Sequence, residues 1–130
     1  MSTTIVTVLS VAAGGALGAV ARYGVNILAV ALAGHAFPWG TMSVNILGSF
    51  LMGALIAGLA HVSVPVPDAM RVFVVTGFLG AFTTFSTFSL DSVTLWERGE
   101  IMQAVLYGGG SVVLSILALV LGLFVVRSLV

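Results

Sequence analysis

The polar side chains that could do chemistry in this sequence lie inside its longest apolar stretches. The densest group is residues 76–89, in which threonines, serines and glycines alternate with phenylalanines. Gly77 and Gly80 weaken a helix, and the hydroxyl groups compete for its backbone hydrogen bonds. We therefore expect a local helix break here, and the carbonyl groups that it frees must be buried in protein or bind a ligand.

Phenylalanines form a stripe along the same segment. At about 100° per residue, Phe82, Phe85 and Phe88 gather on one helix face. The opposite face carries a polar set, which is Thr83, Thr84, Thr87 and Asp91. A phenylalanine stripe ordinarily faces lipid or the protein core, but the positive edge of an aromatic ring can also face an anion. The pattern leaves both roles open.

Two further polar stripes have a four-residue spacing, which places each stripe on one helix face. Their members are Thr41, Asn45 and Ser49 in the first and Tyr107, Ser111 and Ser115 in the second. The asparagine amide either bonds a neighbouring helix or lines a wet pore, since it offers two donors and an acceptor. The serines either line the same path or bond the carbonyl group four residues earlier in their own helix.

The elements that position these residues are membrane helices. Of the 130 residues, 60% are hydrophobic and 6% are charged, whereas a soluble domain carries about a quarter charged residues. Charge-free stretches predict helices at about 4–33, 41–60, 71–96 and 102–126, each long enough for a span of roughly 20 residues. The predicted fold class is an all-α integral membrane protein, with one four-helix transmembrane domain over residues 1–130 and both termini on one side.

The composition excludes several classes of function. The formal net charge is zero, so the sequence has no basic footprint for nucleic acid. Cysteine is absent, which removes disulfides, thiolate nucleophiles and thiolate metal ligands. Two histidines and four acidic residues leave little material for hydrolysis, so we expect no enzymatic activity. No Lys or Arg precedes the first apolar run, so we expect a retained helix rather than a secretory signal.

The first predicted helix has its own spaced set on one face, namely Gly14, Gly18, Arg22 and Asn26. The two glycines allow another helix to approach closely. Arginines in the loops show almost no bias between the two sides of the membrane, so either insertion direction should cost about the same. Such dual topology allows an antiparallel dimer of inverted copies. The alternative is that Arg22 snorkels to the membrane surface and fixes one orientation.

Three segments resemble the Fluc (CrcB) family of fluoride channels. They are residues 14–23 (GGALGAVARY), 40–48 (GTMSVNILG) and 77–89 (GFLGAFTTFSTFS). The third is the most specific, and the likeness extends over essentially the whole chain. It implies an antiparallel homodimer with two separate fluoride pores and one structural sodium ion at the dimer interface.

The resemblance also implies roles for individual residues. The sodium ligands are the backbone carbonyl groups of Gly80 and Thr83, at the helix break of both copies. The pore residues are Phe85, Phe88, Asn45, Thr41, Ser86, Thr87, Tyr107, Ser111 and Ser115. Arg22 and Gly77 are expected to be structural. Asp91 stands where the family pattern leads us to expect the longer Glu.

The function that the resemblance implies is passive, fluoride-selective efflux through a multi-pass protein of the bacterial inner membrane. Fluoride enters cells as neutral hydrogen fluoride, dissociates and is trapped, so a channel for the anion gives fluoride resistance. A small multidrug exporter is the alternative, since it also has four helices and dual topology. Such an exporter needs a carboxylate in its first helix, and residues 1–33 contain none. A structural subunit without transport would leave the hydroxyl cluster at 76–89 unexplained.

Overall fold

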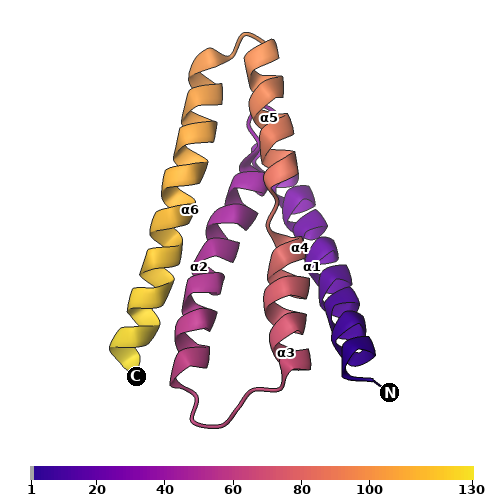
Figure 1. The fold of residues 1–130 in the computed structure, drawn as a ribbon. Coiled ribbons are helices and arrows are strands. Elements are labelled where there is room, and N and C mark those ends of the chain that lie inside the picture. Colours follow the sequence, from indigo (N-terminus) through magenta and orange to yellow (C-terminus); the bar gives the residue numbers. More distant parts are fainter. Residues whose placement is uncertain (1) are drawn as a thin grey trace.

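Four long helices make up most of the protein, and the computed structural model describes residues 2–130 (Figure 1). Three are continuous, namely α1 (Thr3–Ala33), α2 (Trp39–His61) and α6 (Ile101–Leu129). The other is divided into α3 (Asp68–Val72), the π-helical segment η1 (Phe73–Leu79), α4 (Gly80–Phe82) and α5 (Phe85–Glu97). All four are long and apolar enough to cross a membrane, which confirms the predicted all-helical membrane class.

The helices form two pairs that diverge toward the end of the molecule where both termini lie (Figure 1). α6 packs along α2, and α1 packs against η1 and α4. Beyond the break, α5 packs against α6. The interrupted third helix therefore joins the two pairs, because its first half lies on α1 and its second half on α6.

Glycines allow α1 and η1 to pack backbone against backbone. A Cβ atom at Gly14 would overlap the carbonyl group of Phe73, and one at Gly18 would overlap the carbonyl group of Phe78. From the opposite side, a Cβ atom at Gly77 would meet the backbone of α1. This close approach is the kind that a small-residue face provides in membrane helices. No local sequence pattern predicts the π-helical hydrogen bonding of η1.

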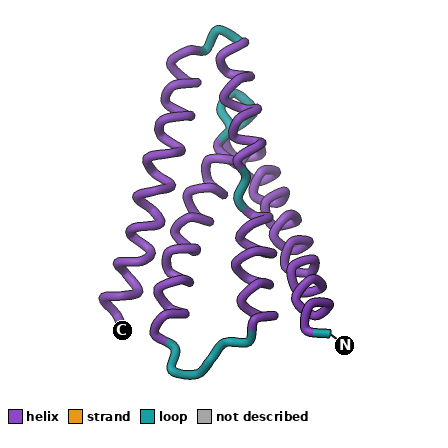
Figure 2. Tube along the Cα trace, in the orientation of Figure 1, coloured by secondary structure: helices purple, strands orange, loops and turns teal. Residues whose placement is uncertain are grey.

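The third long helix breaks inside the segment where the sequence predicts a break. Thr83 has ψ 160°, and Thr84 has φ −154° and ψ 125°, so both residues are extended. The break is the short loop between the two helical halves in Figure 2. It lies near the middle of a membrane-length helix, where its backbone groups need partners within the protein.

The break also overturns one prediction. Phe82 does not share a face with Phe85 and Phe88, because helical periodicity does not continue through extended backbone. Phe82 is buried, and its ring stacks on the Phe78 ring with 5.9 Å between the centroids. Phe85 is 77% exposed on this chain. The phenylalanine stripe is therefore two separate groups, one on each side of the break.

Candidate functional site

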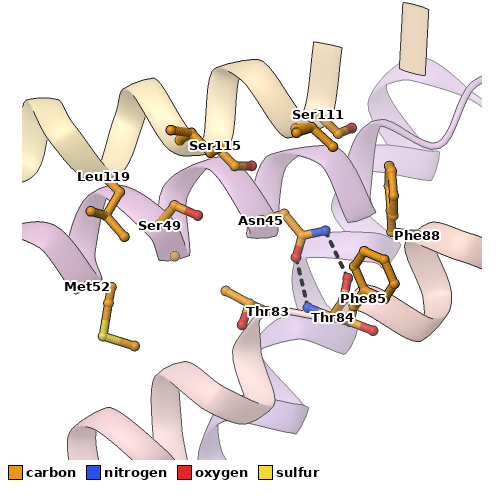
Figure 3. A pocket seen from close by; sticks show the side chains of 13 residues that line it. Asn45, Ser49, Met52, Thr83, Thr84, Phe85, Phe88, Ser111, Ser115 and Leu119 are labelled. Carbon is orange, nitrogen blue, oxygen red and sulfur yellow. Dashed lines mark hydrogen bonds between the residues drawn. The ribbon is translucent and has the colours of Figure 1, made fainter. Parts of the chain in front are cut away.

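The extended backbone at the break is held by the side chain of Asn45 on α2 (Figure 3). The Asn45 Oδ1 atom accepts a hydrogen bond from the Thr84 N–H at 2.8 Å, and its Nδ2 donates to the Thr84 carbonyl at 2.9 Å. Thr84 also caps α5, because its Oγ1 accepts from the Thr87 N–H at 3.2 Å. One of the two Nδ2 hydrogens of Asn45 remains for another acceptor.

The same hydrogen bonds free the carbonyl groups of the preceding turn. In a continuous helix, the N–H groups of Thr84 and Thr87 would donate to the carbonyl groups of Gly80 and Thr83. Here they donate to Asn45 Oδ1 and to Thr84 Oγ1. Gly80 and Thr83, the predicted sodium ligands, therefore present main-chain oxygens without these helical donors. Oxygen is the ligand type that hard cations prefer, so the residues present fit a sodium ion.

A cavity of about 330 Å³, which we call the central cavity, lies between α2, α6 and the break (Figure 3). The sequence-predicted site residues that line it are Asn45, Thr83, Phe85, Phe88, Ser111 and Ser115. Ser49 and Thr84 add polar groups, and Met52 and Leu119 are among its apolar lining residues. The fold thus gathers residues from three distant parts of the chain around one space.

Two serines of the central cavity have hydroxyl groups without a partner. Ser111 Oγ and Ser115 Oγ are buried and make no hydrogen bond to any group in residues 2–130. By contrast, Ser89 and Ser92 on α5 donate to the carbonyl group four residues earlier in their helix. A buried hydroxyl without a partner is costly. The two α6 serines are therefore available to donate hydrogen bonds to an occupant of the cavity.

Aromatic rings form the wall at one end of the central cavity. The Phe88 ring centroid lies 5.5 Å from that of Phe85 and 5.4 Å from that of Tyr107. Tyr107 is fully buried, and its hydroxyl donates to Asp91 Oδ2 at 2.9 Å. The hydrogen of the Tyr107 hydroxyl is therefore used in the bond to Asp91. Tyr107 contacts Phe88, which lines the central cavity, and Asp91, which lines a second cavity.

That second cavity, which we call the upper cavity, has a volume of about 260 Å³. The predicted pore residues Thr41 and Thr87 line it together with Asp91. Asn26 of α1 and His35 of the α1–α2 loop complete its polar lining. The predicted polar residues are therefore distributed over two cavities, one on each side of the Phe88–Tyr107 pair.

Five predicted residues line neither cavity, namely Tyr107, Gly80, Ser86, Arg22 and Gly77. Ser86 is exposed, and its hydroxyl is 3.5 Å from Thr84 Oγ1. Arg22 is half-buried on α1, and Gly77 packs against the α1 backbone. Within one chain, Ser86 therefore lies beside the break but lines neither cavity.

The sequence prediction missed several residues that build the site. The sequence pattern predicts Thr84 on the polar face of a helix, whereas Thr84 is the extended partner of Asn45 and the N-cap of α5. A threonine directly before a helical segment is an N-cap signal that could have identified it. The pairing of Asp91 with Tyr107 and the position of His35 depend on tertiary packing, and no local pattern marks them.

The chemistry that this arrangement supports is recognition of an ion. No group of three or more His, Asp or Glu side chains that could hold a metal is present within residues 2–130. The central cavity instead combines uncharged donors, aromatic rings and a helix break. Such groups can replace part of the water shell of an anion without a fixed positive charge.

Comparison with known proteins identifies similar sequences over almost the entire chain. Residues 9–123 match the family model described as CrcB-like protein, Camphor Resistance (CrcB). A protein of Paracoccus denitrificans named fluoride-specific ion channel FluC is 57% identical over 123 residues, which are 95% of this chain and 96% of that protein. FluC 1 of Nitrobacter hamburgensis is 53% identical over 122 residues, covering 94% and 96%. FluC of Rhizobium meliloti is 50% identical over 123 residues, covering 95% and 98%.

Proposed function

The chain belongs to the CrcB family, and on that premise we propose that it is a passive channel for fluoride in the bacterial inner membrane. It lets fluoride leave the cytoplasm down its electrochemical gradient and so protects the cell from fluoride toxicity. The observation that carries this proposal is the central cavity, in which partnerless serine hydroxyls, the Asn45 amide and phenylalanine rings surround one space. No covalent step is involved, so the protein is not an enzyme.

Fluoride is small and strongly hydrated, so a conducting path must replace its water without holding the ion tightly. Ser111 and Ser115 each offer a hydroxyl donor, and Asn45 offers its remaining Nδ2 hydrogen. Phe85 and Phe88 add the weak positive potential of their ring edges. None of these groups carries a full charge, which favours release of the ion on the far side.

Thr41 and Thr87 extend the path into the upper cavity, beyond the wall formed by Phe88 and Tyr107. We place Ser86 and Tyr107 beside the path as well. The Tyr107 hydroxyl already donates to Asp91, so its contribution is the position of its ring. The exposure of Ser86 on a single chain is consistent with its reaching the path only in a dimer.

The functional unit in this proposal is an antiparallel homodimer. The small arginine bias between the two membrane sides supports dual topology. Gly80 and Thr83 of both copies would hold a structural sodium ion through their carbonyl groups. The Asn45 and Thr84 bonds that free these carbonyls support that assignment. The ion would supply positive charge at a place where two helix breaks meet, and it takes no part in chemistry.

Replacing Gly80 by valine tests the dimer and its ion site. Within one chain, a Cβ atom at Gly80 would meet only the Val75 carbonyl oxygen, at an ordinary 3.7 Å. The substitution should therefore leave the protomer folded but lower dimer formation and fluoride flux, because the branched side chain crowds the other copy. Side-chain changes at Thr83 should matter less. Normal dimers with full transport in Gly80→Val would overturn this part of the proposal.

The orientation of the copies is tested by a reporter at Val130. Dual topology predicts reporter signal on both sides of the membrane in comparable amounts. A signal on one side only would exclude the antiparallel dimer.

Efflux from liposomes separates the proposed channel from a multidrug exporter. Purified protein is reconstituted into vesicles loaded with fluoride, chloride or a cationic dye, and the release of each is followed first without and then with an imposed proton gradient. The channel releases fluoride and retains chloride and the dye. Release of the dye driven by a proton gradient would instead favour the exporter, although residues 1–33 contain no carboxylate to couple it.

A further inference from the structure

The upper cavity adjoins a smaller one beside the loop that connects α1 and α2. This smaller cavity has a volume of about 90 Å³ and is lined by residues of that loop and of the end of α5. His35, Pro38 and Asp91 line both cavities, so the two adjoin. A continuous surface therefore leads from Thr41 and Thr87 outward past His35 to Arg98. We call this surface the outer mouth.

Only three of the side chains that line the outer mouth carry or can gain a charge. Asp91 lies on α5, Arg98 is the residue directly after α5, and His35 lies in the α1–α2 loop. The lining residues from α1 and the start of α2 are uncharged, and from α6 Tyr107 donates to Asp91. The formal charges of Asp91 and Arg98 sum to zero, so the protonation of His35 decides whether the net charge of the outer mouth is zero or positive.

We propose that His35 is a proton-controlled recruitment residue of the fluoride path, which attracts the anion to the outer mouth when its imidazole is protonated. The inference rests on the proposed function and adds pH regulation of fluoride capture at one end of the path. A positive mouth raises the local concentration of an anion and its rate of capture.

The size of the effect follows from Coulomb's law. One unit charge acting on fluoride over roughly 10 Å in a water-like dielectric changes its local concentration about twofold. Fluoride flux through the parent protein should therefore rise about twofold as the pH falls from about 8 to about 5.

The test is fluoride efflux from vesicles held at the same pH on both sides, with the leak of protein-free vesicles subtracted because hydrogen fluoride crosses lipid unaided. Flux at each pH is divided by the flux of the same variant at about pH 8. His35→Gln should lack the rise on acidification. His61→Gln is the matched control, because the other histidine of the chain lies at the end of α2, outside both cavities, with its Nδ1 near the Ala57 carbonyl at 2.8 Å. It should keep the parent profile.

Arg98→Gln provides a second, independent variant. Without the Arg98 guanidinium, the negative charge of Asp91 leaves the outer mouth net negative, so fluoride flux at neutral pH should fall. The rise in flux on acidification should remain, because His35 is still present. A flat parent profile, or a His35→Gln profile equal to that of the parent, would overturn the inference while leaving the channel intact. Absence of fluoride flux from the parent at every pH would overturn the proposed function itself, so the two failures are distinguishable.

Discussion

Replacing Asn45 by aspartate should abolish most fluoride conduction, for two reasons that the structure separates. In Asn45→Asp, one carboxylate oxygen can still accept from the Thr84 N–H, but the other faces the Thr84 carbonyl oxygen where Nδ2 now donates at 2.9 Å. A buried carbonyl left without a donor costs about 1–3 kcal/mol. In addition, the new charge repels a permeant anion by about 4 kcal/mol at 4 Å and an effective dielectric constant of about 20.

Even the electrostatic part alone predicts a flux loss of at least about a hundredfold, since each 1.36 kcal/mol is about tenfold in rate. Asn45→Leu isolates the structural part, because it removes both bonds to Thr84 without adding a charge. It should lower the free energy of unfolding by about 2–6 kcal/mol, the cost of two buried groups left unpaired. Thr84 is only 9% exposed, so water cannot fully replace the amide.

The assays are fluoride efflux from liposomes and unfolding of the purified protein in detergent. Ser49→Ala is the matched control, because Ser49 lines the same cavity one helical turn away and makes no bond to the break. It should unfold like the parent. Parent-like flux in Asn45→Asp would refute the reasoning, and parent-like unfolding of Asn45→Leu would show that the amide does not hold the break.

Three further predictions concern packing, rings and hydroxyls. Gly18→Ala should destabilise the protein by about 1–3 kcal/mol, because its Cβ atom would overlap the backbone of η1. Gly15→Ala is the control and should unfold like the parent, because the space around Gly15 is open. Phe85→Ile and Phe88→Ile keep apolar bulk but remove the ring potential, so each should cut flux roughly tenfold, about 1.4 kcal/mol in barrier, with dimers intact; parent-like flux in both would exclude an electrostatic role for the rings. Ser111→Ala should lower flux without lowering the unfolding temperature, because its hydroxyl has no partner to lose; loss of stability with unchanged flux would contradict this.

The membrane class and the helices could be predicted from composition and length alone. Long charge-free stretches have one stable solution in a bilayer, so the predicted ranges 4–33, 41–60 and 102–126 lie close to the observed helices α1, α2 and α6. The break in the third helix was also predictable, because glycines and hydroxyls in one segment weaken its backbone bonds. Its effect on side-chain directions was not, and the grouping of Phe82 with Phe85 failed for that reason.

The candidate site was predictable only as separate stripes. Asn45 and Ser111 each belong to a polar face with a four-residue spacing, and the fold places both faces on one cavity. The partner of Asn45 is the main chain of Thr84, which a side-chain pattern does not reveal. The Tyr107–Asp91 bond joins two helices, so it too follows from packing and not from local sequence.

The central claim, passive conduction that selects fluoride, is tested most directly by the reversal potential of the current through the purified protein in a planar bilayer. With fluoride and chloride gradients set in opposite directions and the same pH on both sides, the account predicts reversal at the equilibrium potential of fluoride. Reversal at the equilibrium potential of chloride would contradict it. So would a shift of the reversal potential when a proton gradient is then imposed across the same bilayer.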